Sequence, residues 1–167
     1  MHTHIFLGAD HGGFVIKEQI KRWLIEELPD QYEVHDLGAT DLDPADDYPQ
    51  FAFAVAQRVA EGQDSLSDFS ETSALLPAYG VLFCRSGGGM SIAANKVAGI
   101  RAVPVYSVQE AKHAREHNNT HILSVAADWN SVEEIKEIIT TFLFTPFSLE
   151  SRHIARIQQI SAFEKIE

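Results

Sequence analysis

The 167-residue sequence has a single cysteine and few basic side chains. One cysteine excludes an intrachain disulfide and a cysteine-rich zinc site. Its 13 lysine and arginine residues face 24 aspartate and glutamate residues, and the formal charge of −11 argues against binding nucleic acid through bulk charge. No apolar stretch approaches the length of a membrane span, and the amino terminus lacks the features of a signal peptide. We therefore expect a cytoplasmic protein without membrane or nucleic-acid partners.

Apolar runs typical of buried strands alternate with segments whose apolar residues follow a helical period. Strands are expected at residues 4–8, 32–37, 81–84, 100–105 and 121–126. Helices are expected after Gly13, from Pro49, from Ser91, after Ser107, after Asn130 or Ser131, and over residues 148–164. This alternation predicts one domain, residues 1–167, with a doubly wound parallel sheet.

Two features limit how the chain is arranged around that sheet. Pro104 lacks an N–H donor, so it must lie at the end of a strand or on an edge strand. Residues 61–78 are rich in serine and acidic residues and are long for a connection in an α/β domain. We expect a surface insertion there, more readily explained as a solvated loop than as a lid or a partner-binding segment.

The most unusual stretch covers residues 79–97, where an apolar run ends at Cys84 and a glycine loop leads into a helix. Backbone N–H groups in such a loop form an anion site, and a thiol beside them is biased toward thiolate. Cys84 is thus a candidate base or nucleophile, with the Ser86 hydroxyl and an oxyanion cradle at Gly87–Gly89. The alternatives are a cysteine that only fills the core and a glycine run that is only a tight turn.

Two further groups of residues could carry acid–base or metal chemistry. Asp10 and His11 follow the first strand, and an aspartate can set the tautomer and charge of a histidine beside it. His113 and His117 are spaced to share one helix face, as a metal pair would. No third ligand is apparent nearby, so a solvated helix face is the better explanation and we expect no metal site.

Arg152 and Arg156 project from one face of the last expected helix. Two guanidinium groups on one face suit a phosphate, which accepts bidentate hydrogen bonds. The alternative is a pair of surface arginines bound to acids such as Glu150. His117 precedes the fifth strand, whereas Cys84 follows the third, so these residues should lie at opposite edges of the sheet. A single subunit would then not assemble them all, unless a second subunit supplied the rest.

Several segments together resemble one enzyme family. In chain order they are G-A-D-H-G-G-F, D-Y-P, C-R-S-G-G-G-M-S-I-A-A-N-K-V-A-G-I-R-A, A-R-E-H-N-N and R-H-I-A-R. They are similar to the ribose-5-phosphate isomerase B family, which includes the galactose-6-phosphate isomerase subunits. The resemblance covers nearly the whole chain and is most specific from Cys84 to Ala102.

The resemblance implies a Rossmann-like three-layer α/β/α sandwich with a five-stranded parallel sheet and a C-terminal helix that packs on a partner subunit. It implies a homodimer or tetramer whose active site is shared between subunits, with no metal and no organic cofactor. The implied reaction interconverts D-ribose 5-phosphate and D-ribulose 5-phosphate through a cis-enediolate.

The resemblance also implies roles for individual residues. Cys84 would move a proton between C2 and C1, Ser86 would assist transfer between O1 and O2, and His117 of the partner subunit would open the sugar ring. The other implied substrate contacts are Asp10, His11, Tyr48, the backbone of Arg85, Gly87, Gly88 and Gly89, and Asn118, Arg152 and Arg156.

Several positions depart from the family pattern, and Arg85 and Asp128 bear most on the substrate. Arg85 stands where members often have glycine, and Asp128 lies near where many have another phosphate-contacting arginine. The alternative enzyme is therefore an isomerase of a hexose 6-phosphate of the galactose or allose type. The alternative outside the enzymes is a sugar-phosphate-binding module, against which Cys84, Ser86 and His117 together argue.

Overall fold

The computed structural model describes residues 2–62 and 75–164 of the chain. Within them lies one parallel sheet with the strand order β2-β1-β3-β5-β4. Its strands are β1 (Thr3–Ala9), β2 (Tyr32–Asp36), β3 (Ala78–Cys84), β4 (Ala102–Val105) and β5 (Ile122–Ala126). The predicted five-stranded parallel sheet is confirmed for these residues.

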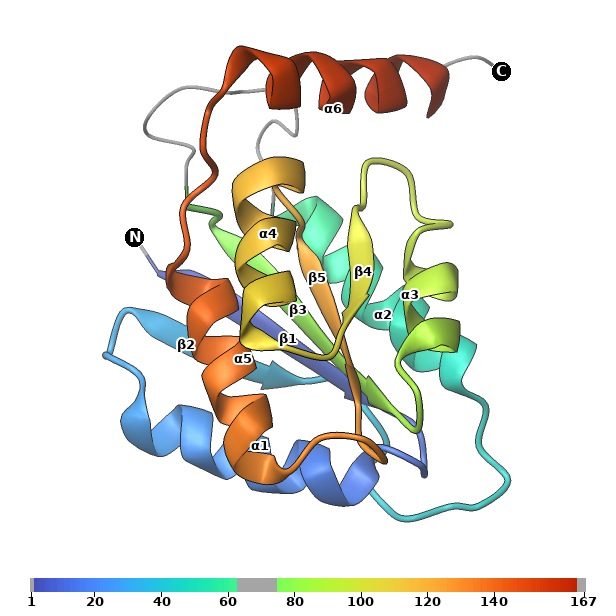
Figure 1. Cartoon of the computed structure of the whole chain (residues 1–167). Coiled ribbons are helices and arrows are strands. Elements are labelled where there is room, and N and C mark those ends of the chain that lie inside the picture. The colour runs from blue at the N-terminus through green and yellow to red at the C-terminus, as the bar shows by residue number, and fades with distance from the viewer. Residues whose placement is uncertain (1, 63–74, 165–167) are drawn as a thin grey trace.

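Helices cover both faces of this sheet (Figure 1). One face carries α1 (Phe14–Glu27), α4 (Val108–Asn118) and α5 (Val132–Phe144), and the other carries α2 (Tyr48–Glu61) and α3 (Gly88–Ala94). The last helix, α6 (Ser151–Glu164), belongs to neither layer and crosses the end of the molecule above α4 (Figure 1). The three-layer α/β/α arrangement is therefore confirmed.

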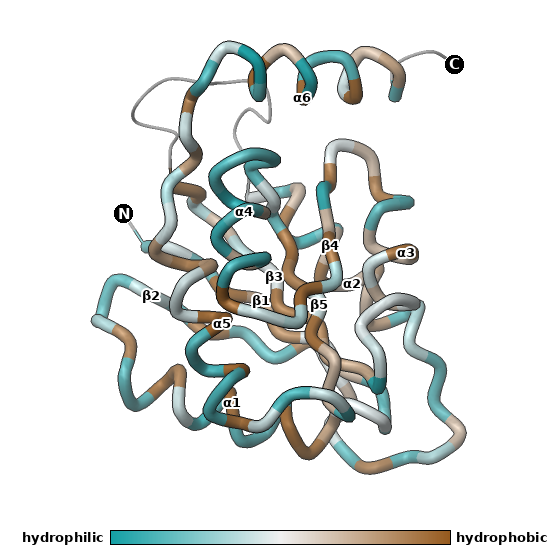
Figure 2. The backbone as a smooth tube through the Cα atoms, viewed as in Figure 1, coloured by the Kyte–Doolittle hydropathy of each residue, from teal (hydrophilic) through white to brown (hydrophobic). Residues whose placement is uncertain are grey.

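The central strand β3 is buried along its whole length, as expected for a parallel strand covered on both faces. Its side chains alternate between the two cores. Tyr79, Val81 and Phe83 pack with α1, α4 and α5, whereas Leu82 and Cys84 pack with α2 and α3. Apolar residues accordingly gather in the central strands, while α4 is largely hydrophilic (Figure 2).

Local sequence signals predicted several element ends correctly. Ser107 caps α4 and accepts a hydrogen bond from the Glu110 N–H. Ser131, one of the two candidates, caps α5 through a reciprocal capping box with Glu134. Pro104 lies in β4, which is an edge strand as required.

Four element starts lie two or more residues from the prediction. β3 begins at Ala78 instead of residue 81, α3 at Gly88 instead of Ser91, β4 at Ala102 instead of residue 100, and α6 at Ser151 instead of Ser148. The expected insertion at 61–78 falls mainly on residues 63–74, which lie outside the described residues. Among the described helices none is both long enough and apolar enough to cross a bilayer.

Candidate active site

The loops that follow β1, β3 and β5 meet at the carboxyl edge of the sheet. The Ala127 N–H donates to the Cys84 carbonyl at 2.9 Å, and the Asp128 N–H donates to the Arg85 carbonyl at 3.1 Å. These bonds join the loop after β5 to the start of the glycine loop. The loop after β1 lies against the same loop, because a Cβ at Gly12 would come within 2.9 Å of the Arg85 side chain.

The glycine loop has a conformation that depends on Gly87. Its φ of 77° is left-handed, where a side chain would be strained, and its Cβ would lie only 3.1 Å from the Ser124 carbonyl. The buried Ser124 hydroxyl donates to the Gly87 carbonyl at 2.6 Å and fixes the loop on β5. Sequence analysis did not identify Ser124, although a serine within the apolar strand I-L-S-V-A was a usable signal.

Tyr48 lies over the other end of the same loop. A Cβ at Gly89 would approach the tyrosine ring to 2.8 Å, so only glycine admits the ring at this distance. The aromatic side chain at the start of α2 thereby lies beside the start of α3. A cavity of about 760 Å³ opens at this point, lined by Asp43, Ala45, Asp46, Asp47, Tyr48, Pro49 and Gln50.

Cys84 lies at the end of β3 with 7% of its surface exposed. Its Sγ accepts a hydrogen bond from the Gly87 N–H at 3.2 Å, within the turn that carries half-buried Ser86. Burial raises the pKa of the Cys84 thiol, while the N–H groups of Gly87, Met90 and Ser86 lower it and the charge of Asp10 raises it. The net effect is a thiol pKa above the ordinary value of cysteine. The predicted bias toward thiolate is therefore wrong for this chain by itself.

Arg85 is not among the groups that lower the pKa of the Cys84 thiol. Its side chain is 70% exposed, and its guanidinium lies 3.6 Å from the Asp128 carboxylate. This ion pair joins the loops that follow β3 and β5 and holds the guanidinium at the surface. Two of the positions that depart from the family pattern, Arg85 and Asp128, are thus neighbours in space.

Asp10, His11 and Asp46 form a polar cluster beside the glycine loop. Asp46 accepts hydrogen bonds from the His11 N–H at 2.9 Å and pairs with His11 Nδ1 at 2.7 Å. This side-chain hydrogen bond raises the pKa of His11. Burial raises the pKa of Asp10, partly offset by the Gly13 N–H. The cluster therefore favours a protonated imidazole at the edge of the site.

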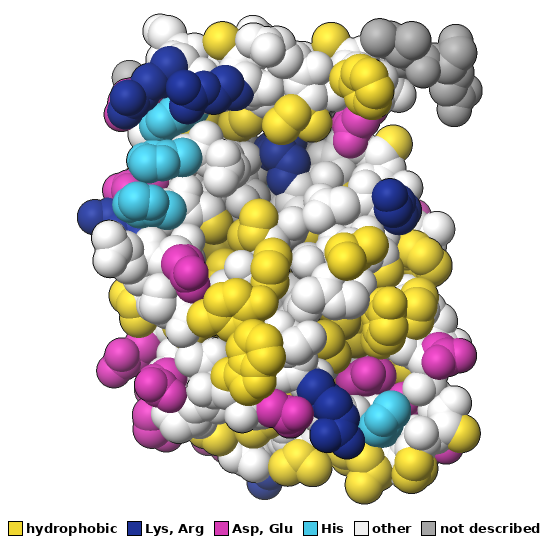
Figure 3. Space-filling model, turned by 45° about the vertical axis from the view of Figure 1, so that its right-hand side comes forward, with side chains coloured by type: hydrophobic (Ala, Val, Ile, Leu, Met, Phe, Trp, Pro, Cys, Tyr) yellow, Lys and Arg dark blue, Asp and Glu magenta, His cyan; other side chains and the backbone are white. Residues whose placement is uncertain are grey.

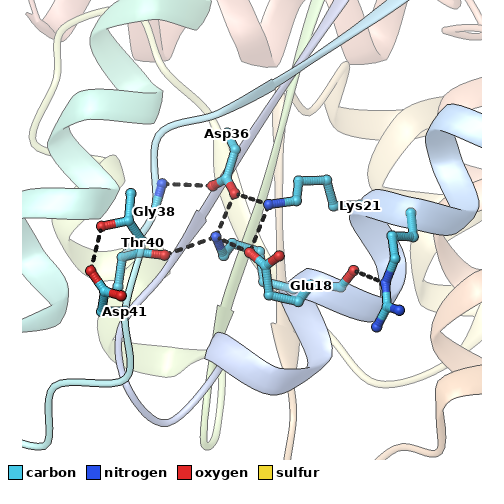
Figure 4. Close-up of polar contacts among 9 residues, drawn as sticks. Glu18, Lys21, Asp36, Gly38, Thr40 and Asp41 are labelled. Atoms are coloured by element: carbon cyan, nitrogen blue, oxygen red, sulfur yellow. Dashed lines mark hydrogen bonds and ion pairs between the residues drawn. The ribbon is translucent and has the colours of Figure 1, made fainter.

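Sequence analysis missed Asp46 because its loop looks solvated. Its side chain is only 7% exposed, and its Oδ2 has no hydrogen-bond partner among the described residues. The start of this loop is held by Asp36, which accepts hydrogen bonds from Lys21 and from the Gly38 N–H (Figure 4). Fully buried Lys17 also binds Asp36 and donates to the Ala39 carbonyl at 2.9 Å.

The remaining predicted residues lie at the amino edge of the sheet. His117 and Asn118 end α4, and Arg152 and Arg156 lie on α6. The His117 ring centroid is 4.7 Å from that of His113 and 4.4 Å from that of His153. Figure 3 shows histidine side chains beneath basic side chains at one upper corner of the molecule.

The arginines of this edge support both of their predicted interpretations. Arg152 pairs with Glu150 at 2.8 Å and is 63% exposed, as in the surface-pair alternative. Arg156 is exposed and borders a cavity of about 340 Å³ that Asn118 also lines. Neither edge alone holds all the predicted groups, and one chain leaves them at opposite ends of the sheet (Figure 1).

Comparison with known proteins identifies relatives of the whole chain. Residues 5–160 match the family model described as ribose/galactose isomerase. A ribose-5-phosphate isomerase B of Mycobacterium tuberculosis is 37% identical over 162 residues, which are 96% of this chain and 90% of the relative. A putative sugar phosphate isomerase of Bacillus subtilis is 37% identical over 161 residues, covering 96% and 97% of the two chains.

Solved structures agree with these sequence matches. The ribose-5-phosphate isomerase B of Mycoplasma genitalium, solved with bound ribulose-5-phosphate, has a TM-score of 0.86 and 35% identity, covering 100% of this chain and 99% of that one. The type B ribose 5-phosphate isomerase of Trypanosoma cruzi has a TM-score of 0.83 and 40% identity, covering 98% and 97%. The likeness therefore extends over the full fold.

Proposed function

This chain belongs to the ribose/galactose isomerase family, and on that premise we propose that it is an aldose–ketose isomerase acting on ribose 5-phosphate and ribulose 5-phosphate. The observation that carries the proposal is the match over residues 5–160, which includes the Cys84 loop, the end of α4 and most of α6. The substrate is a small phosphorylated sugar, interconverted through a cis-enediolate.

The chemical step takes place at the carboxyl edge in this proposal. The Cys84 thiolate removes the proton from C2 of the open-chain aldose and returns it to C1. The Ser86 hydroxyl moves the second proton between O1 and O2. Backbone N–H groups of residues 85–89 hold the enediolate oxygens, a form of stabilisation worth roughly 3 to 4 kcal/mol per donor in other enzymes. The left-handed Gly87 and its bond from Ser124 support this by keeping the loop fixed.

The phosphate and the sugar ring are held by the other edge of a second subunit. His117 of the partner subunit opens the furanose ring with Asn118 beside it, and the partner's Arg152 and Arg156 bind the phosphate. The large separation of these residues from Cys84 in one chain supports a homodimer with shared sites. Exposed Ile160 and Phe163 on α6 support the same arrangement, because a partner would bury them.

The raised thiol pKa makes one demand on the mechanism. The thiol of the free chain holds its proton at neutral pH, and the thiolate forms as pH rises toward the raised pKa. The N–H groups of Gly87 and Met90 stabilise that thiolate once it forms. The hydrogen bond with Asp46 raises the pKa of His11, which favours positive charge at the same edge for the substrate's oxygens.

Substrate profiling tests this function. The purified chain is assayed with ribose 5-phosphate, with allose and galactose 6-phosphates, and with ribose that lacks phosphate. We expect kcat/KM for the pentose phosphate to exceed that for either hexose phosphate by roughly tenfold or more. Faster turnover of a hexose phosphate would favour the hexose isomerase instead. Binding of all the phosphates without turnover would favour the non-catalytic module.

A further inference from the structure

A second group of titratable side chains lies on β1 and β2, at the edge of the sheet remote from the other edge strand, β4. It comprises His4 of β1 together with Glu33 and His35 of the edge strand β2. His4 is paired with Glu33 in the register, and Phe6 with His35. Because alternate residues of a strand share a face, these three side chains project from the same side of the sheet. The proposed isomerase reaction uses none of them.

The three ligand atoms form a compact triangle. His4 Nδ1 lies 3.0 Å from His35 Nε2 and 3.4 Å from Glu33 Oε2, and His35 Nε2 lies 3.8 Å from the same oxygen. Ligands at tetrahedral positions around Zn²⁺, at about 2.0 to 2.1 Å from the metal, are separated from each other by about 3.4 Å. The observed separations bracket that value, so the triangle has the dimensions of one face of a zinc tetrahedron.

We propose that His4, Glu33 and His35 bind a divalent transition-metal ion, with Zn²⁺ as the best fit. Imidazole and carboxylate ligands suit Zn²⁺, whereas Mg²⁺ and Ca²⁺ prefer oxygen ligands throughout. The fourth position belongs to water or to His2, whose Nδ1 lies 3.1 Å from the other oxygen of Glu33. Two imidazoles, one carboxylate and an open fourth position are a recurrent zinc arrangement.

Packing holds the imidazoles in place before a metal arrives. The His35 ring stacks on Phe6 with centroids 4.9 Å apart, and lies 5.2 Å from the His4 ring. Phe6 is only 4% exposed, so it gives the rings a fixed support.

The charges around the triangle are compatible with a bound cation. Glu33 brings a carboxylate into the triangle itself. The cation facing it from α2 is Arg58, which lies 5.4 Å from the Phe6 ring centroid and is itself paired with Glu61 at 2.9 Å. Because His4 and Glu33 lie near the amino ends of their strands, the metal would tie β2 to β1 without touching the Cys84 loop. The site is therefore structural, and isomerase turnover is expected to be independent of it.

Metal titration of the full chain tests the proposal. After treatment with a chelator the protein is titrated with Co²⁺, followed by its visible absorption, and then with Zn²⁺ and Mg²⁺. We expect one equivalent of Co²⁺ with the intense spectrum of tetrahedral coordination, displaced by Zn²⁺ and unaffected by Mg²⁺. Zn²⁺ should also raise the melting temperature of the wild-type chain.

Three variants assign the ligands. The double variant His4→Ala/His35→Ala, and separately the milder Glu33→Gln, should weaken Zn²⁺ binding by more than roughly tenfold, since even second-sphere partners cost that much. His113→Ala, which removes an exposed histidine elsewhere, should bind Zn²⁺ like the wild type. Undiminished binding in Glu33→Gln and the double variant, or loss in His113→Ala, would overturn the assignment. A wild-type chain that binds no Zn²⁺ would show that the triangle is an ion-pair cluster only.

Discussion

The two edges of the sheet differ in how completely one chain builds them. At the carboxyl edge Cys84, Gly87 and Ser124 are buried and joined by short hydrogen bonds. At the amino edge His117 is half-buried, and Arg152 and Arg156 are exposed. A rigid, mostly buried loop suits stabilisation of a small enediolate, whereas exposed guanidinium groups suit capture of a phosphate. The difference fits the proposal that each chain presents two half-sites.

Charge distinguishes the edges in the same way. The carboxyl edge carries acids around Tyr48, and its exposed guanidinium, Arg85, is engaged by Asp128. The amino edge gathers histidine side chains of α4 and α6 and the two arginines of α6, and Figure 3 shows histidine and basic side chains grouped at one corner of the molecule. A phosphate would therefore be attracted to the amino edge rather than to the loop that holds the thiol. Two copies that faced each other edge to edge would supply both halves.

Loss of the thiol should give the largest effect. Cys84→Ala is expected to lower kcat by roughly 10²- to 10⁴-fold, the usual contribution of a general base, while substrate binding is retained. In the wild type kcat/KM should rise with pH over the alkaline range, because burial raises the pKa of the thiol and the thiolate forms only there. Stopped assays over a range of pH measure kcat of Cys84→Ala and the pH dependence of kcat/KM in the wild type. The exposed neighbour Ile92→Ala is the control, and unchanged turnover in Cys84→Ala would exclude this base.

Removal of the two arginines should come next. Arg152→Ala/Arg156→Ala is expected to raise KM for ribose 5-phosphate by roughly a hundredfold, because each charged hydrogen bond contributes about 1.5 to 3 kcal/mol. Arg22→Ala, an exposed arginine of α1 that donates to the Glu18 carbonyl, serves as the matched control. Steady-state kinetics and thermal melting are measured together. A lower melting temperature with an unchanged KM would support the alternative, in which Arg152 only forms a surface ion pair with Glu150.

Release of the glycine loop should have a moderate effect. Ser124→Ala removes the donor to the buried Gly87 carbonyl, which should cost about 1 to 3 kcal/mol of stability and lower kcat by roughly tenfold. Ser107→Ala removes the N-cap of α4 and should cost about 1 kcal/mol without a change in kcat. Denaturant melts and kcat are compared for the pair. Equal kcat losses in both variants would mean that the loop bond has no specific role.

The anchor of the Asp46 loop should affect activity least. Lys17→Met leaves Asp36 with Lys21 and the Gly38 N–H, so we expect a loss of roughly 2 to 3 kcal/mol of stability, below that of a fully broken buried pair. kcat/KM should change less than roughly threefold, within the small range expected for residues that do not bind substrate.

The loss of stability at acid pH gives a second readout for the Lys17→Met variant. Burial raises the pKa of the Asp36 carboxyl, but the hydrogen bonds from Lys17 and Lys21 hold that pKa below its ordinary value. A lowered carboxylate pKa adds stability that is present above about pH 4 and disappears as pH falls through the folded pKa. Lys17→Met should therefore flatten the acid loss of stability. A melt profile as steep as that of the wild type would contradict the assigned ion pairs.

Sequence patterns predicted what depends on local chemistry. The strand–helix alternation gave the three layers, Ser107 and Ser131 gave two helix starts, and Pro104 gave an edge strand. The placement of His117 and Cys84 at opposite edges followed from chain order alone. These features need only neighbouring residues or the handedness of the fold.

Long-range packing produced the features that the sequence did not predict. α2 and α3 cover Cys84 and raise its pKa, although its immediate neighbours suggested the reverse. Asp46 looks like a solvated loop residue until His11, far away in sequence, pairs with it. α3 starts within the glycines, because Gly87 turns the chain there despite glycine's low helix propensity.

Mixing two inactive variants tests the shared site most directly. Cys84→Ala and Arg152→Ala/Arg156→Ala chains are unfolded together, refolded as an equal mixture and assayed with ribose 5-phosphate. In a two-fold dimer with shared sites, each mixed dimer has one intact site, so about a quarter of wild-type activity should return. Activity that stays at the level of the separate variants would contradict a site built from both edges of two subunits.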